Sequence, residues 1–253
     1  MNLSTIQYLA IIWIVSAIVI FPFLLRITAP YGRHSKRNWG PMIDNKLGWV
    51  LMEFPSLLIF VLLVLIGPNH SSPTIWVLFC LWTIHYFNRS VIFPLRTRTK
   101  GKKMPILIML SAVFFNLVNA GLNGYWLGFS APAYPDNWMT DPRFILGGVI
   151  FIAGFMINQA ADKKLISLRK GGNDGYFIPR GGLFNYISCP NFFGEIIEWT
   201  GFAIMAWNLP ALSFAVWTAA NLIPRALDHH RWYKEYFKDE YPRKRKAIIP
   251  FIV

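Results

Sequence analysis

The chain has 253 residues, of which 55% are hydrophobic and 15% charged, and its formal net charge at pH 7 is +13. Its long apolar runs leave no soluble domain to carry a nucleic-acid-binding groove, so the positive charge does not indicate a nucleic-acid partner. Cys80 and Cys189 lie in separate segments, outside any CxxC or Cys/His cluster. This excludes a disulfide framework and gives no zinc or iron–sulfur signature.

The apolar runs predict seven membrane-spanning helices. Residues 5–25 contain no charged side chain and reach the roughly 20 residues that a bilayer requires. We expect this helix to be retained, because Met1–Ile6 lacks the basic start of a cleavable signal peptide. The others are expected at about 47–66, 73–93, 104–126, 143–160, 190–207 and 209–224. The last two are divided because Asn208-Leu209-Pro210 is a turn signal within one long apolar stretch. The sequence thus predicts an all-α integral membrane protein, a single seven-helix bundle over residues 1–253.

The basic residues predict the orientation of this bundle. Of the 25 lysines and arginines, Arg143 alone lies on one side. The other 24 lie in or beside the connections 26–46, 94–103, 161–189 and 225–253. Short basic connections stay in the cytosol. We therefore expect the N-terminus outside, the C-terminus in the cytosol, and these four segments as a cytosolic cap.

Polar residues recur at the cytosolic half of the predicted helices. A charged group inside a membrane is costly and usually faces a protein interior or a wet cavity. A spacing of four places residues on one helix face, as for Asn158 and Asp162. Helix capping and interfacial snorkelling account for some of these residues, but Glu53 has no capping role. The complete set is Glu53, His85, Tyr86, Asn88, Arg89, Asn158, Asp162, Asn191, Glu195, Glu198, Arg225, His229 and Tyr233.

A polar pocket that opens to the cytosol and is ringed by basic residues suits an elongated anionic cofactor with an apolar substrate beside it. The sequence has no G-x-G-x-x-G or G-x-x-x-x-G-K-[ST] motif, so a nucleotide would be held by the bundle and its loops. It also lacks H-E-x-x-H and G-x-S-x-G, which removes support for hydrolysis. His229 and His230 are adjacent and point about 100° apart on a helix. We therefore expect no metal.

Several segments resemble one known family. NFFGEIIEWTGFAIMAWNLPALSFA (191–215) and RALDHHRWYKEYFKDEYPRKRKAIIPFIV (225–253) are similar to the C-terminal signature of steroid 5α-reductases, the 3-oxo-5α-steroid 4-dehydrogenases. The resemblance covers nearly the whole chain, and the length is typical of type 2-like enzymes. A bacterial homologue of these enzymes is one expectation that it allows. The further matching pieces, in order, are APYGRH (29–34), MEFPS (52–56), HYFNRS (85–90), YPDNW (134–138), TDPRF (140–144), NQAADKKLISLRK (158–170) and IPRGGLFNYIS (178–188).

The resemblance implies an NADPH-dependent reduction of the C4–C5 double bond of a 3-oxo-Δ4-steroid. Glu53 and Tyr86 match the catalytic pair that hydrogen-bonds the steroid 3-ketone. Hydride can add at C5 only if the 3-oxygen receives charge, and we expect Tyr86, held by Glu53, to donate to it. The positions that match cofactor-binding residues are Asn158, Asp162, Arg169, Asn191, Glu195, Arg225, His229 and Tyr233, with Arg98 as a candidate phosphate contact.

The sequence departs from the family pattern at two places. Asp228 stands where relatives often have another histidine, and the basic loop reads PLRTRTKGKK (94–103), which leaves the phosphate contacts of Arg96 and Arg98 open. The expected partners are a steroid and membrane lipids, with no obligate protein partner, so we expect a monomer. The expected location is the endoplasmic reticulum of a eukaryote or the inner membrane of a bacterium.

Other functions compete with this one. A membrane reductase of enoyl-thioester or polyprenol substrates would share the fold and the NADPH site. An isoprenylcysteine-type methyltransferase would use S-adenosylmethionine, but its Arg-His-Pro style motif is missing. A transporter would need a polar path across the whole bilayer, whereas the polar groups here occupy one half.

Overall fold

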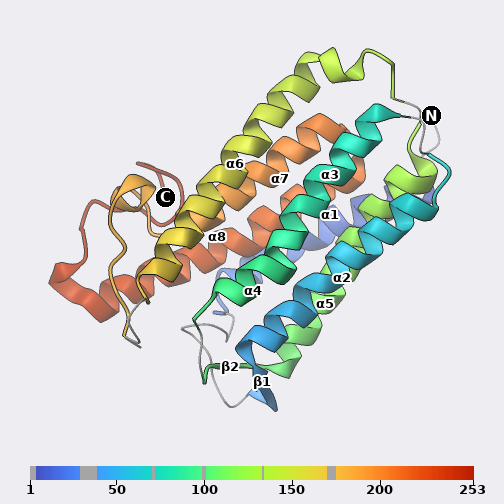
Figure 1. Ribbon diagram of the computed structural model, residues 1–253. Coiled ribbons are helices and arrows are strands. Elements are labelled where there is room, and N and C mark those ends of the chain that lie inside the picture. The colour runs from blue at the N-terminus through green and yellow to red at the C-terminus, as the bar shows by residue number, and fades with distance from the viewer. Residues whose placement is uncertain (1–3, 29–38, 70–71, 99–100, 133, 170–174) are drawn as a thin grey trace.

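The computed structural model describes residues 4–28, 39–69, 72–98, 101–132, 134–169 and 175–253. The described chain is a bundle of long helices packed side by side (Figure 1). The APYGRH segment (29–34) lies outside the described residues. The long helices are α1 (Thr5–Leu24), α2 (Asn45–Ile66), α3 (Pro73–Phe87), α5 (Ile106–Tyr125), α6 (Pro142–Ser167), α7 (Pro190–Ala206) and α8 (Leu209–Phe237).

Short elements complete the bundle. A π-helical turn, η3 (Asn88–Ile92), and the short α4 (Phe93–Arg96) prolong α3, and a second π turn, η4 (Trp126–Ser130), prolongs α5. Strands β1 (Met42–Asp44) and β2 (Lys103–Pro105) pair antiparallel, with Ile43 opposite Met104. Each strand runs directly into a long helix, so the pair fixes the starts of α2 and α5 at the same end of the bundle (Figure 1). Three 3-10 turns are η5 (Trp138–Thr140), η6 (Gly182–Asn185) and η7 (Lys238–Glu240).

Five helical segments of the described chain are long and apolar enough to cross a membrane. They are Thr5–Leu24, Asn45–Ile66, Pro73–Arg96, Ile106–Ser130 and Pro142–Ser167. Helices α7 and α8 occupy the other two positions at which the sequence predicts a span. Helix α7 has 17 residues, and the last turns of α8 are rich in charged side chains. The expectation of a mostly helical membrane protein is confirmed, whereas the count of seven spans stays a prediction.

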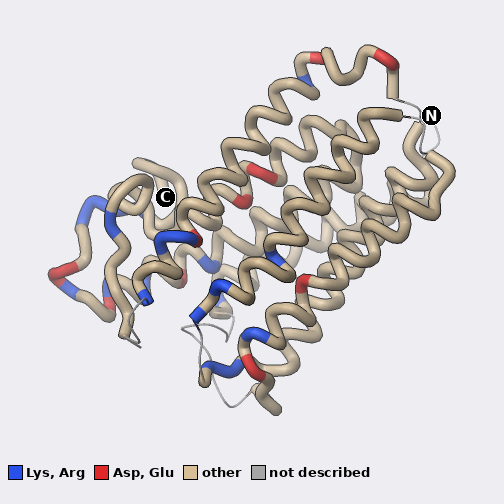
Figure 2. Tube along the Cα trace, in the orientation of Figure 1, with Lys and Arg blue, Asp and Glu red and all other residues tan. Residues whose placement is uncertain are grey.

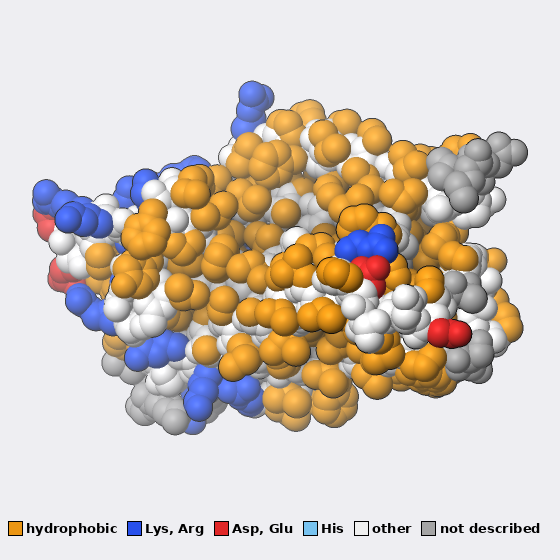
Figure 3. Space-filling model, turned by 90° about the horizontal axis from the view of Figure 1, so that it is seen from above, with side chains coloured by type: hydrophobic (Ala, Val, Ile, Leu, Met, Phe, Trp, Pro, Cys, Tyr) orange, Lys and Arg blue, Asp and Glu red, His pale blue; other side chains and the backbone are white. Residues whose placement is uncertain are grey.

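Two helices continue well past the membrane spans expected from the sequence. Helix α6 runs beyond residue 160 to Ser167, and α8 runs beyond residue 224 to Phe237. Apolarity marks where a helix leaves a membrane, not where its backbone hydrogen bonds stop, so the charged extensions lie outside the predicted spans but remain helical. Lysine and arginine gather at this end of the bundle (Figure 2). On the face seen in Figure 3, apolar side chains cover most of the surface between the ends, interrupted by a few charged ones.

Helices α6 and α7 pack unusually closely through glycines. Gly147 and Gly154 on α6 face Gly194 and Gly201 on α7, and a Cβ atom at any of the four would overlap backbone atoms of the other helix. Small residues at such a crossing let two backbones approach. The pairing holds the polar residues of α6 and α7 against one another.

Candidate active site

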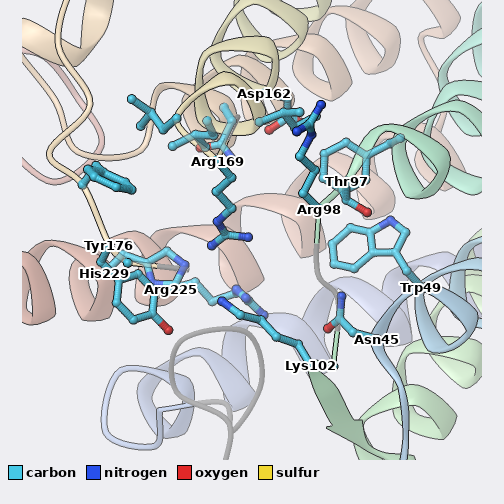
Figure 4. Close-up of a pocket in the computed structure, with 18 of the residues that line it drawn as sticks. Asn45, Trp49, Thr97, Arg98, Lys102, Asp162, Arg169, Tyr176, Arg225 and His229 are labelled. Atoms are coloured by element: carbon cyan, nitrogen blue, oxygen red, sulfur yellow. The ribbon is translucent and has the colours of Figure 1, made fainter. Parts of the chain in front are cut away.

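A pocket of about 840 Å³ opens at the basic end of the bundle. Its wall combines the starts of α2 and α7, the end of α6, part of α8, and the segments around Arg98 and Tyr176. Figure 4 shows Arg98, Arg169 and Arg225 reaching into the same space, with Lys102 beside them. Four cationic side chains from three parts of the chain, the loop 94–103, the end of α6 and α8, therefore converge on one cavity.

Seven of the predicted cofactor-binding residues line this pocket. Asp162 lies in the last turns of α6 and Arg169 two residues after it, so both are beyond the predicted membrane span 143–160. Arg96, the other arginine left open in the basic loop, is not among the lining residues, whereas Arg98 is. The seven are Arg98, Asp162, Arg169, Asn191, Arg225, His229 and Tyr233.

The remaining predicted site residues lie deeper in the bundle and meet around Arg89. Its guanidinium lies 3.5 Å from Asp162, 3.7 Å from Glu195 and 4.0 Å from Glu53. The arginine side chain is 11% exposed and none of the three carboxylates is more than 15% exposed. One buried cation thus serves three acids from three helices. It links the predicted cofactor residues Asp162 and Glu195 to the predicted catalytic Glu53.

Asn158 ties α6 to α7 at the same level. Its Nδ2 donates to the backbone oxygen of Asn191 at 3.0 Å and to Oε2 of Glu195 at 3.3 Å. Asn158 is fully buried. The spacing of four that the sequence shows on each helix therefore becomes one contact surface between them.

Glu53 and Tyr86 reach this region from α2 and α3. Nδ2 of Asn116, on α5, lies 3.4 Å from Oε2 of Glu53 and donates to the backbone oxygen of Met52 at 2.5 Å. Tyr86 is 3% exposed and packs on the edge of the His85 ring, with centroids 5.0 Å apart. Among the described residues no hydrogen bond joins Tyr86 to Glu53. No described contact therefore supports the expectation that Glu53 holds Tyr86 directly. Glu53 contacts Arg89 and Asn116 instead.

A buried polar pair lies beside Tyr86. Nδ1 of His85 is 2.6 Å from Oε1 of Glu198, and the two side chains are 2% and 0% exposed. The ring of Trp199 packs on that of His85, with centroids 4.6 Å apart. The pair joins α3 to α7 and fixes the helix turn that carries Tyr86.

Several residues of the site were not selected from the sequence. Trp49 and Asn45 line the pocket one and two turns before Glu53 on α2. Their intervals of four and eight residues from Glu53 place them on the same helix face, which the sequence shows. The sequence also marks Asn116, because it is the first of three asparagines within eight positions of an apolar helix. Lys102 and Tyr176 have no such pattern, because loop packing alone brings them to the pocket.

The C-terminal segment is fastened beside the pocket by Ser188. Its Oγ lies 2.6 Å from Nδ1 of His230, 2.6 Å from the Tyr241 hydroxyl and 3.0 Å from the backbone oxygen of Lys246. Tyr241 stacks on the pocket residue Tyr233, with centroids 5.3 Å apart. The Ser188 contacts therefore support one wall of the pocket.

This fastening makes folding sensitive to acid. His230 lies beyond the predicted span 209–224, and burial, helped by the charges of Lys234 and Arg245, lowers its pKa to about 4. The unfolded chain, with an ordinary pKa of about 6.5, takes up the proton first, so this stabilisation is complete above pH 6.5 and is lost as the pH falls toward 4. We expect His230→Asn to reduce the drop in melting temperature between pH 7.5 and pH 5. An unchanged drop would contradict the assignment.

Comparison with known proteins identifies the family. Residues 102–253 match the family model described as 3-oxo-5-alpha-steroid 4-dehydrogenase. The steroid 5-alpha-reductase DET2 of Gossypium hirsutum is 44% identical over 231 residues, which cover 89% of this chain and 89% of that protein. The chain belongs to the 3-oxo-5-alpha-steroid 4-dehydrogenase family.

Animal members of this family are similar over the same extent. The 3-oxo-5-alpha-steroid 4-dehydrogenase 2 of Rattus norvegicus is 43% identical over 227 residues, covering 88% of each chain. The 3-oxo-5-alpha-steroid 4-dehydrogenase 1 of Homo sapiens is 39% identical over 224 residues, covering 88% of this chain and 85% of that protein. The resemblance stated from the motifs is confirmed, and the protein is an oxidoreductase.

The structure shows the surroundings of the two places where the sequence departs from the family pattern. Asp228 forms an ion pair with Arg231, one turn away, at 3.4 Å. Its side chain therefore has a local partner on α8. Arg98 lines the active-site pocket, although the loop 94–103 around it departs from the family pattern.

Proposed function

We propose that this chain reduces the C4–C5 double bond of a 3-oxo-Δ4-steroid, with NADPH as the hydride donor. The observation that carries the proposal is the continuous polar path from the cation-lined pocket, through Arg89, to Glu53 in an otherwise apolar bundle. A polyanionic cofactor and an apolar substrate with one polar atom need such an arrangement. The relatives named above are steroid 5-alpha-reductases and 3-oxo-5-alpha-steroid 4-dehydrogenases.

The described residues fit the cofactor. Arg98, Lys102 and Arg169 would meet its phosphates, with Arg225, His229 and Tyr233 beside them on α8. Asn158, Asp162, Asn191 and Glu195 would surround its nicotinamide end. Asp162 Oδ2 is buried, lies 3.5 Å from the Arg89 guanidinium and accepts no hydrogen bond among the described residues, so it can accept one from a bound amide. When bound, NADPH would supply the hydride that C5 receives, and a proton taken up at C4 would return the resulting enolate to the 3-ketone.

The chain's own residues would then handle the charge that develops on the substrate. As C5 accepts hydride, negative charge moves to the 3-oxygen, and donors already aimed at that oxygen lower the barrier. The Tyr86 hydroxyl would donate one hydrogen bond and a protonated Glu53 the other. Since the two side chains do not hydrogen-bond each other, both remain available to the ketone. The apolar bundle excludes water from the reacting carbons.

The same proposal sets the membrane arrangement. In this proposal the chain spans the membrane seven times, with α7 and α8 as the last two spans, and the N-terminus lies outside. The cytosolic side then holds the pocket, the loops 26–46, 94–103 and 161–189, and the tail 225–253. The charge distribution of Figure 2 supports this orientation. We propose a monomer in the endoplasmic reticulum or in a bacterial inner membrane, with the steroid entering from the lipid.

Tyr86→Phe and Glu53→Gln test the two donors. Each variant removes or weakens one donor at the 3-oxygen, so we expect kcat with progesterone to fall about a hundredfold or more while NADPH still raises the melting temperature. The matched controls are Tyr125→Phe and Glu235→Gln, both exposed, which should keep full activity. Wild-type turnover in either donor variant would remove that residue from the mechanism. Turnover only with enoyl thioesters or polyprenols would point to the alternative reductase.

A further inference from the structure

A groove of about 430 Å³ lies on α6, separate from the active-site pocket. One side is formed by Met156, Ile157, Ala160, Ala161 and Lys164 of α6, and the other by residues 180–184 and Pro190. We propose that this groove binds an anionic phospholipid, with one acyl chain along α6 and the phosphate between Lys164 and Arg180.

The groove continues a surface that faces lipid. Val149, Ile152 and Met156 lie on one face of α6 and are 61%, 56% and 64% exposed. Helical residues three and four apart line up, so this apolar stripe leads from the middle of a candidate membrane span to the groove. Met156, Ala160 and Lys164 follow one another at intervals of four, a rise of about 12 Å from the first to the last. An acyl chain on the stripe therefore ends beside a cation.

The two cations at this end of the groove are available to a ligand. Lys164 and Arg180 are exposed, and neither has an ion-pair partner among the described residues. The nearest acid in sequence, Asp162, is two residues from Lys164 and so about 200° around the helix, where it meets Arg89 inside the bundle. Within the described part of the chain, no ion pair thus balances the positive charge of Lys164 and Arg180.

The loop that carries Arg180 is set by its glycines. Gly181 and Gly182 have φ angles of 92° and 54°, which residues with a Cβ rarely adopt. The Gly181 N–H donates to Oδ1 of Asn185 at 2.9 Å, which closes the turn. Arg180 is thereby fixed on the opposite side of the groove from Lys164.

This combination selects one class of ligand. A free phosphate would meet the two cations but would leave the apolar groove open to water. A zwitterionic phospholipid would fill the groove, but its phosphate already has a cation in its own headgroup. Of these three ligands, the anionic phospholipid satisfies both parts, and basic residues at a membrane surface contribute about a factor of five in affinity each.

The test uses the full chain in detergent micelles, titrated with phosphatidylglycerol while lipid adducts are counted by native mass spectrometry and thermal unfolding is followed. We expect wild type to bind one phosphatidylglycerol in preference to phosphatidylcholine and to melt several degrees higher with it. Lys164→Ala/Arg180→Ala should weaken binding about 25-fold. Ala160→Phe, which fills the groove without changing charge, should abolish the preference.

A matched control removes two other exposed cations. Lys163→Ala/Lys244→Ala changes the net charge equally but leaves the groove intact, and it should bind as wild type does. Equal loss in this control would show diffuse attraction to anionic lipid and overturn the proposal. Equal stabilisation by phosphatidylcholine or by inorganic phosphate would also overturn it, as would full binding by Ala160→Phe.

Discussion

Arg89→Met is expected to lower the free energy of unfolding by about 3 to 5 kcal/mol and to remove measurable turnover. The substitution leaves Glu53, Asp162 and Glu195 close together, largely buried and without the cation that all three share. Methionine keeps most of the side-chain volume, so the loss of stability would come from the missing positive charge and not from a cavity. Thermal unfolding in detergent, with and without NADPH, measures the effect.

A control and a second substitution make this test specific. Arg96→Met, at the exposed end of the same helix, should change stability by no more than about 0.5 kcal/mol. Adding Asp162→Asn to Arg89→Met removes one of the stranded charges and should recover part of the lost stability. If Arg89→Met melts like wild type, Arg89 is not the centre of the buried cluster.

Gly154→Ala is expected to destabilise the protein by about 3 kcal/mol and to lower activity through the displacement of Asn158 and Asp162. A methyl group there would overlap backbone atoms of Glu198 and Gly194, and a backbone cannot rotate away as a side chain can. Helices α6 and α7 would have to separate. The melting temperature and the affinity for NADPH should therefore fall together.

Gly148→Ala is the matched control on the same helix. A Cβ at Gly148 would meet only the Met205 sulfur, at 3.8 Å, an ordinary contact. Alanine favours helix over glycine by up to about 1 kcal/mol, so this variant should be as stable as wild type or more stable. Equal destabilisation by the two substitutions would mean that the close crossing of α6 and α7 is not what Gly154 provides.

Much of the helical framework could be predicted from the sequence because apolar length and turn chemistry are local signals. The break between α7 and α8 falls at Trp207, in the left-handed region with φ 47°, and Asn208, which caps α8 by accepting from the Ala211 N–H. The sequence places its turn there. Helices α6 and α8 end well beyond the membrane spans predicted at 143–160 and 209–224, because charge marks the membrane boundary and not the helix boundary.

The site could be predicted only in part. Spacings of four identified Asn158 with Asp162 and Asn191 with Glu195 as helix faces, and the structure brings these faces together. The role of Arg89 as their common partner depends on tertiary packing and on the π turn that contains it, and neither leaves a pattern in the sequence. The family resemblance predicts that Glu53 holds Tyr86 directly. The described polar contacts of Glu53 are instead with Arg89 and Asn116.

The most direct test of the proposed reaction follows the hydride itself. The purified protein would be incubated with progesterone and NADPH deuterated at C4 of the nicotinamide, and the product examined by mass spectrometry and NMR. The proposal predicts a 5α-dihydro steroid with one deuterium at C5 and the 3-ketone intact. Unchanged steroid in the presence of bound NADPH, or deuterium at C3 in place of C5, would contradict it.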